Sequence, residues 1–257
     1  MYIFKKLFIF IILFTAIFIL FRIANLVPMI LLKEDLTGIA YLYSTIGLIF
    51  SIISAFVIQN QWIRWTKLET AVKSETDSLW ELVLYMEQVP HIDSKQIKKI
   101  MGGYLQSVVG EGWLQMENGE PSHEAEKSLR ELQRSAILMV KNSPEDTSLI
   151  TAFVQGVTNS RNDRLHYSAG HLPYLLYILI IVSTFMLIFL SLFIAVENIY
   201  LDYLFTMSIA LLGFLVFTVI EDLNQPFRPG SWHITNKEYR KLLSRIETKA
   251  SPSEPST

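Results

Sequence analysis

Four apolar segments, separated by polar stretches, dominate the pattern of hydrophobic and polar positions along the chain. Without a single charged side chain, they cover residues 7–21, 39–58, 172–196 and 203–220. A helix needs about 20 apolar residues to cross the hydrocarbon core of a bilayer, where it satisfies its own backbone hydrogen bonds. The pattern therefore predicts four transmembrane helices. Lys5 and Lys6 before the first segment are also typical of a signal peptide, but no small-residue cleavage motif follows, which favours an uncleaved anchor.

The polar segment 59–170 shows helical periodicity from its beginning. Apolar residues continue the helical spacing of the second span at Leu68, Val72, Leu79, Leu82 and Met86. We therefore expect this transmembrane helix to continue past the membrane and to be followed by helices over about 93–116, 122–141 and 144–167. The predicted fold class is all-α. We expect an integral membrane protein with four transmembrane helices and a cytoplasmic helical bundle inserted between spans 2 and 3.

Lys and Arg side chains near the ends of the spans predict the orientation of the chain in the membrane. They precede the first span, flank the segment 59–170 and follow the fourth span, whereas the opposite loops contain only Arg22 and Lys33. We therefore expect both termini in the cytoplasm and the protein in a bacterial inner (plasma) membrane. The expected organisation is a helix pair over 1–58, a cytoplasmic domain over 59–170, a second helix pair over 171–222 and a tail over 223–257, disordered at its end.

Charge and composition exclude several classes of function. With 22 Lys and Arg against 24 Asp and Glu, the net charge is −2, which provides no basic field for nucleic acid. The absence of cysteine excludes a disulfide framework, a thiol nucleophile and Cys-ligated zinc. The five histidines contain no i, i+4 pair, and neither a phosphate-binding glycine loop nor a G-x-S-x-G motif is present. We therefore expect no enzymatic activity, no cofactor and no metal site.

The second span carries a stripe of small and polar residues. One arc of this helix, about 100° wide, contains Ser44, Gly47, Ser51, Ser54, Ile58 and Gln61. A pore-lining helix needs such a face, because water and ions require space and hydrogen-bonding groups. Small residues also let two transmembrane helices pack closely without a pore, and the stripe alone favours that packing. A pore with one such helix per subunit requires a ring of subunits, and the charge-free spans favour a passive route.

Three short motifs occur in a recognisable order later in the chain. They are a Y-x-x-x-V-x-x-E-x-W segment, an Arg-x-x-Arg run before the third span and an acid followed by Pro-Phe after the fourth. Their matching positions are Glu111 and Trp113, then Arg161 and Arg164, then Asp222, Pro226 and Phe227. In this ordered set, the chain resembles the bestrophin-like proteins of the DUF4239 family over about residues 39–230.

The resemblance implies a function for the stripe of the second span. Bestrophins are pentameric anion channels whose second membrane helix lines the pore, so the resemblance implies a conduit along this face. The position of Arg161 and Arg164 at the cytoplasmic end of the third span suggests that they raise the local anion concentration, although positive-inside topology and interface anchoring explain them at least as well. Bestrophins follow their Pro-Phe motif with a run of acids that binds calcium. This chain has Arg228-Pro-Gly-Ser-Trp232 there, which argues against a calcium site.

These observations lead to two functional hypotheses. The first is a homo-oligomeric passive channel for small inorganic ions, with anions favoured, embedded in the lipid bilayer. The alternative is a non-conducting membrane scaffold or sensor that binds a partner through its cytoplasmic helices.

Overall fold

The computed structural model describes residues 2–23, 33–89, 94–117, 120–142, 147–193 and 198–250. Within these ranges the chain is helical, with turns and no β-strand, which confirms the predicted all-α class. The chain divides into two compact units. We call Met1–Trp62 with His171–Trp232 the membrane unit, and Ile63–Gly170 with His233–Thr257 the bundle unit. The long helix α2, Lys33–Gln88, contributes residues to both.

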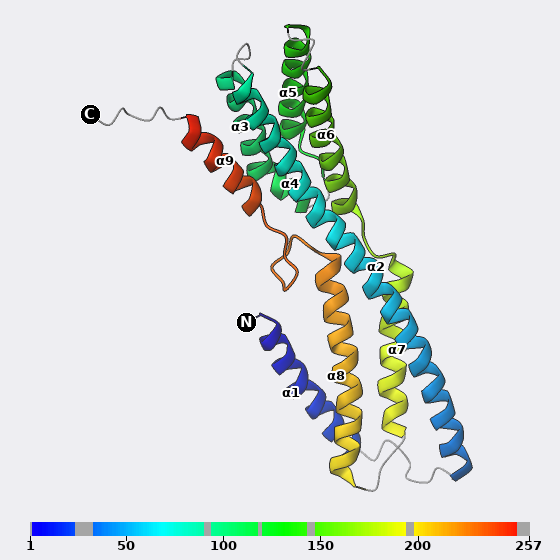
Figure 1. The fold of residues 1–257 in the computed structure, drawn as a ribbon. Helices are drawn as coiled ribbons and strands as arrows, with labels where there is room; N and C mark the ends of the chain where they lie inside the picture. The colour runs from blue at the N-terminus through cyan, green and yellow to red at the C-terminus, as the bar shows by residue number, and fades with distance from the viewer. Residues whose placement is uncertain are drawn as a thin grey trace. The chain divides into compact units, whose positions relative to one another are not determined.

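The membrane unit contains α1 (Tyr2–Ile23), the first part of α2, α7 (Tyr174–Phe193) and α8 (Ile199–Asn224) (Figure 1). Four helices among the described residues are long and apolar enough to cross a membrane, in agreement with the four predicted spans. Two of them extend beyond their apolar windows, because neither α2 nor α8 meets a helix-breaking residue where hydropathy falls.

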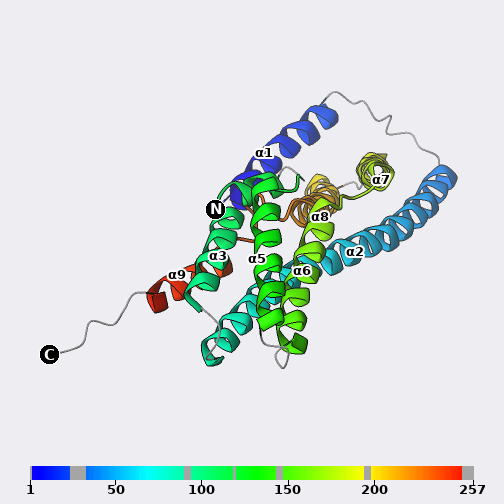
Figure 2. The ribbon, with the colours of Figure 1, turned by 90° about the horizontal axis from the view of Figure 1, so that it is seen from above.

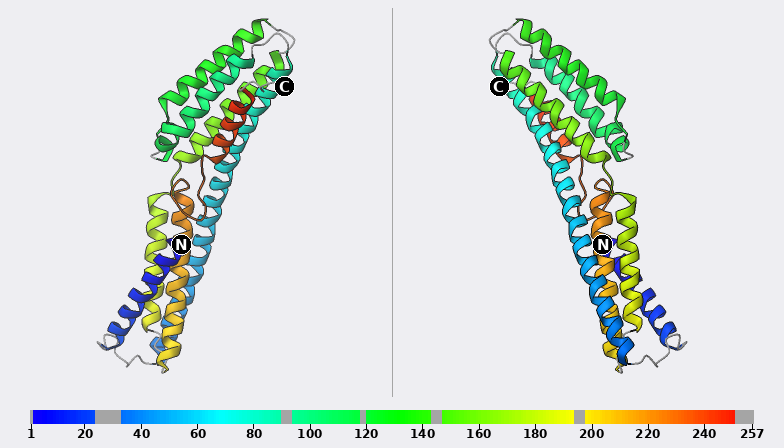
Figure 3. Two further views of the ribbon diagram at one scale, coloured as in Figure 1. Left: turned by 90° about the vertical axis from the view of Figure 1, so that its left-hand side faces the viewer. Right: turned by 90° about the vertical axis from the view of Figure 1, so that its right-hand side faces the viewer.

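Two apolar clusters hold the membrane unit together. Phe50 and Val57 of α2 pack with Ile180 and Leu187 of α7 and with Ile220 of α8. On the other side, α1 packs its aromatic rings against α7 and α8 in a cluster of Phe14, Phe18, Leu192 and Ala210. Helices α7 and α8 therefore form the shared centre, as Figure 3 shows by their side-by-side course.

The close approach of α7 and α8 depends on one glycine. A Cβ atom added to Gly213 would collide with the side chain of Thr184 on the facing helix. Small residues at such a crossing let two helix backbones approach and gain van der Waals contact, which is the main attraction between helices in lipid.

The bundle unit contains the second part of α2 with α3 (Ser94–Ser107), α4 (Trp113–Glu117), α5 (His123–Asn142), α6 (Thr147–Ala169) and α9 (Lys237–Ala250). Helix α5 packs on α3 and α6 (Figure 2). The residues predicted to continue the apolar period of α2, from Leu68 to Met86, are at most 3% exposed, which confirms that part of the pattern. The helix expected over 144–167 was predicted to begin within residues 143–146, which lie outside the described ranges. Residues 251–257, which belong to the tail end predicted to be disordered, also lie outside them.

The helix expected over 93–116 is interrupted, which corrects the prediction. A π-helical turn over Val108–Gly112 separates α3 from α4, and Gly110 there has non-helical angles of φ −81° and ψ −118°. Two glycines within five residues remove much of the preference for continuous helix. A Cβ atom on Gly112 would lie 2.6 Å from the carbonyl oxygen of Ser107, so the turn needs glycine there.

Helix α9 was not predicted from the sequence, which indicated only a cytoplasmic tail after the fourth span. It packs on α3 through Tyr239, Leu242 and Ile246, each at most 4% exposed. The i, i+3, i+7 spacing of these residues is the signal that could have revealed an amphipathic helix.

Candidate functional site

The stripe of the second span is divided by its packing. Ser44 and Ser51 are exposed and donate their hydroxyl groups to the carbonyl oxygens of Ala40 and Gly47, at 2.9 and 2.8 Å. Both bonds stay within α2. Intrahelical bonds of this kind keep a hydroxyl satisfied in lipid while its oxygen stays available to a passing ion or water.

The remaining four residues of the stripe pack partly or fully inside the membrane unit. Ser54 and Gln61 are 4% and 5% exposed, and the hydroxyl of Ser54 has no hydrogen-bond partner in the described part of the chain. Gly47 and Ile58 are half-buried, and a Cβ atom on Gly47 would lie 3.8 Å from Leu187. The predicted arc therefore runs from the unit's interior to its surface, and only its Ser44–Ser51 edge is exposed.

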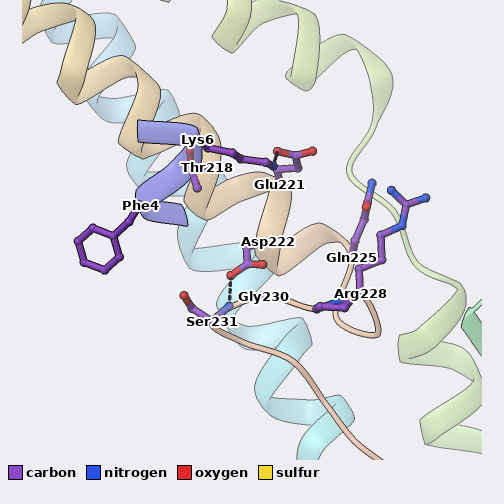
Figure 4. Close-up of a pocket in the computed structure, with 10 residues that line it drawn as sticks. Phe4, Lys6, Thr218, Glu221, Asp222, Gln225, Arg228, Gly230 and Ser231 are labelled. Carbon is purple, nitrogen blue, oxygen red and sulfur yellow. Dashed lines mark hydrogen bonds and ion pairs between the residues drawn. The ribbon is translucent and has the colours of Figure 1, made fainter. Parts of the chain in front are cut away.

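The acidic end of α8 has local partners that explain two charges at an unfavourable position. Carboxylates at a helix C-terminus are repelled by the helix dipole. Glu221 lies 3.5 Å from the ammonium of Lys6 on α1. Asp222 accepts a hydrogen bond from the backbone N–H group of Ser231 at 2.7 Å (Figure 4). It accepts a second bond from the backbone N–H group of Trp232 at 3.4 Å. These local contacts offset the unfavourable position of the two acids at the end of α8.

The Pro-Phe motif forms the turn that brings the chain back to Asp222. Pro226 and Phe227 are buried. A Cβ atom on Gly230 would collide with the Asp222 carboxylate, so this turn closes only around glycine. Trp232 then contacts the ring of Trp62, with centroids 6.1 Å apart. The family motif therefore closes a loop at the end of the fourth span.

Among the described residues, no group of three His, Asp or Glu side chains is arranged to hold a metal ion.

A second ion pair joins the other ends of α1 and α8. Arg22, in the last turn of α1, donates to the carboxylate of Asp202, in the first turn of α8. The Asp202 side chain is 3% exposed and that of Arg22 is 19% exposed. Arg22 and Asp202 attract each other, and each charge also interacts favourably with the dipole of its own helix. Lys6 and Glu221, in contrast, each lie at the unfavourable end of their helix.

A buried charged cluster lies in the bundle unit. Its centre, Glu75, was not among the site residues predicted from the sequence. The carboxylate of Glu75 on α2 receives hydrogen bonds from the Arg164 guanidinium of α6, at 2.7 and 3.2 Å. It also accepts the hydroxyl groups of Tyr104 on α3 and Tyr239 on α9, the latter at 3.0 Å. All four residues are at most 3% exposed. We call these residues the Glu75 cluster.

Burial and the central carboxylate shift the titration of its neighbours. Burial alone would lower the pKa of the Arg164 guanidinium, but the Glu75 carboxylate raises that pKa well above its usual value. Burial, reinforced by Glu75, raises the pKa of both the Tyr104 and Tyr239 hydroxyl groups. Arg164 therefore stays charged and both tyrosines stay neutral donors. The sequence signal for Glu75 is its position: it shares the apolar face of α2 with Leu68, Val72 and Leu79.

Three other motif residues of the bundle unit lie in different environments. Arg161 is 7% exposed, and Trp113 is 6% exposed with its ring 6.0 Å from that of Tyr239. Glu111 is exposed on the π-helical turn. The guanidinium of Arg164 is occupied by Glu75, so an anion-attracting role for the two arginines stays a prediction.

Comparisons with known proteins agree with the ordered motifs. The model of the Bestrophin-like domain matches residues 9–236. The chain belongs to the bestrophin-like family. The narrower DUF4239 assignment stays a prediction. No curated protein sequence matches the chain.

Solved structures share the fold of this family member. A bacterial bestrophin homologue from Klebsiella pneumoniae aligns with a TM-score of 0.74 at 12% identity, covering 97% of this chain and 98% of that one. A point variant of a Klebsiella pneumoniae homologue gives 0.71 at 10% identity, covering 82% and 87%. A further crystal structure, described as that of a membrane protein, gives 0.75 at 11% identity, covering 96% and 99%. At these identities the likeness concerns the fold.

Proposed function

We propose that this protein is a passive ion channel, formed by a ring of identical subunits in a bacterial inner membrane with both termini in the cytoplasm. Its pore is lined by the exposed edge of α2 that carries Ser44 and Ser51. The observation that carries the proposal is this serine-bearing edge on a membrane helix of a bestrophin-like chain, because exposed hydroxyl oxygens can replace water around a passing ion.

Two further exposed residues, one between the two serines and one beyond them, belong to the proposed pore face. Leu48, which is 63% exposed, and the exposed Ala55 share one helix face with Ser44 and Ser51 at i, i+4, i+7 and i+11 spacing. A face of two hydroxyl groups and two apolar side chains carries no fixed charge. Such a pore selects weakly, and the family resemblance favours anions as the permeant species.

Cysteine scanning tests this assignment directly, since the native chain contains no cysteine. The variants Ser51→Cys and Phe56→Cys form a matched pair, because both positions are exposed on α2 and Phe56 is 61% exposed. In liposomes with a chloride flux readout, we expect a charged methanethiosulfonate reagent to block Ser51→Cys and to leave Phe56→Cys unaffected. Equal block of both variants, or no flux from the unmodified channel, would refute the proposal.

One observation favours the second candidate function, a non-conducting scaffold. Two of the six stripe residues, Ser54 and Gln61, are buried within the membrane unit, where they serve packing. If bulky substitutions at Ser51 abolish oligomers in mass photometry while wild-type protein passes no current, the stripe is a packing surface and the scaffold is the better description.

A further inference from the structure

A pocket with balanced charges lies at one end of the membrane unit. It has a volume of about 720 Å³ and is lined by the first turns of α1, the end of α8 and the loop that follows (Figure 4). Two cations, Lys6 and Arg228, and two acids, Glu221 and Asp222, share it with apolar groups that include Phe4. The volume is within the range of ligand sites, about 300–1,000 Å³.

The level of the pocket along the membrane-spanning helices indicates which molecules can reach it. Phe4 is 76% exposed at the start of a candidate membrane span, and the apolar run of α8 ends at Ile220, directly before Glu221. The pocket thus begins where apolar helix surface gives way to charged residues. In a bilayer this is the layer of lipid headgroups.

The charge arrangement indicates the chemistry of the ligand. A purely anionic headgroup would meet Lys6 and Arg228 but would also be repelled by Glu221 and Asp222. A headgroup with one phosphate and one primary ammonium uses both signs, because cations bind phosphate and carboxylates accept from ammonium. We propose that this pocket binds the headgroup of a zwitterionic aminophospholipid such as phosphatidylethanolamine, with its acyl chains along the apolar surface beside Phe4.

The contacts already present in the pocket leave room for this ligand. Lys6 and Glu221 lie 3.5 Å apart, with side chains 38% and 39% exposed. An exposed pair at that separation contributes little, so a phosphate and an ammonium can insert at small cost. Asp222 holds the loop through Ser231 and Trp232, which fixes the wall that carries the exposed Arg228.

Native mass spectrometry of the full chain, released from nanodiscs, tests the proposal. With dioleoyl phosphatidylethanolamine, phosphatidylcholine and phosphatidylglycerol as probes, we expect phosphatidylethanolamine to be retained best. Phosphatidylcholine has the same charges but no N–H donor, so it should bind more weakly. Preferential retention of phosphatidylglycerol would overturn the proposal, because it would mean that the pocket selects net negative charge.

Two variants separate the contributions of the two charges. Arg228→Gln changes an exposed side chain, and we expect it to weaken phosphatidylethanolamine binding about tenfold through loss of a charge-assisted bond to phosphate. Glu221→Gln should weaken phosphatidylethanolamine by a similar factor and leave phosphatidylglycerol unchanged or stronger. Arg240→Gln and Glu247→Gln, at exposed positions of α9 outside the pocket, serve as matched controls. Unchanged phosphatidylethanolamine binding in Arg228→Gln would refute the site.

A competition experiment distinguishes a membrane lipid from a soluble ligand of the same chemistry. Glycerophosphoethanolamine carries the headgroup without acyl chains, and at millimolar concentration we expect it to displace less than a tenth of the bound lipid. Complete displacement would show that the headgroup alone binds, which would overturn the assignment to a membrane lipid.

Discussion

The membrane unit and the bundle unit place their charges and apolar side chains in opposite ways. In the most apolar 18-residue stretch of each candidate span, only 11% to 22% of the residues are buried, and large apolar residues such as Leu175 are exposed. Its ion pairs lie at the two ends of α1 and α8. In the bundle unit, apolar residues of α2, α3 and α9 are buried and a charged carboxylate lies at their centre.

The contrast follows from the solvent around each unit. In lipid, a helix gains little by hiding apolar side chains, so packing depends on close approach and charges move to the watery ends. In water, apolar residues drive the interior together, and a buried charge persists only when every one of its bonds is made. Helix α2 shows both behaviours, because its apolar Phe56 is exposed in the membrane unit and its charged Glu75 is buried in the bundle unit.

The largest effect should come from removing the charge at the centre of the bundle unit. Glu75→Gln leaves Arg164 buried without its counter-charge, and we expect a loss of about 3–5 kcal/mol in the free energy of unfolding. Denaturant titration of the detergent-solubilised chain measures it. Glu69→Gln, which breaks the exposed pair with Lys73 on the same helix, should cost about 0.5 kcal/mol or less. Equal losses would contradict the distinction between the two environments.

The second effect concerns alkaline pH and belongs to the tyrosines of the Glu75 cluster. Their pKa values are raised in the folded chain, so above pH about 10 the unfolded chain releases two protons that the folded chain keeps. Unfolding free energy should then fall with rising pH, by up to about 2.7 kcal/mol per pH unit. Melting curves between pH 9 and 11 measure this slope. In the Tyr104→Phe/Tyr239→Phe double variant the slope should become shallower; an unchanged slope would exclude these groups as its source.

A smaller effect is expected from the buried ion pair of the membrane unit. Asp202→Asn removes the negative charge that Arg22 contacts while keeping the side chain's size, and we expect a loss of about 1.5–3 kcal/mol. Unfolding in a mixed detergent series reports this change. The double variant Arg22→Gln/Asp202→Asn should recover part of the loss, because no charge is then left without its partner; a further additive loss would argue against direct coupling.

The smallest effect should come from the exposed pair at the opposite end of the same two helices. Glu221→Gln breaks the contact with Lys6, and we expect at most about 1 kcal/mol in the same unfolding assay without added phospholipid. A loss as large as that of Asp202→Asn would mean that burial does not separate the two ion pairs.

Hydropathy and periodicity were enough to predict most of the helices. The four spans and the continuation of α2 through Leu68 and Met86 depend on residues that are near neighbours on one helix. The interruption at Gly110 and the amphipathic helix around Tyr239 were also local signals, although they were weaker than the apolar runs. The ordered motifs indicated the family, and the family model that matches residues 9–236 confirms it.

The Glu75 cluster could not be derived in this way. Tyr104, Arg164 and Tyr239 lie 29, 89 and 164 residues from Glu75. A glutamate on an apolar helix face indicates that some partner must exist, since a lone buried carboxylate is too costly. Nothing in the spacing shows which of the chain's cations or hydroxyl groups fills that role.

By itself, the sequence determined the spans that are apolar enough for lipid and most of the helical segments, because both properties depend on contacts within a few residues. Only the tertiary structure decided how the stripe on α2 divides between exposed Ser51 and buried Ser54, and why acids end α8. Those outcomes depend on which surfaces meet, and helices that are remote along the chain bring the deciding atoms together.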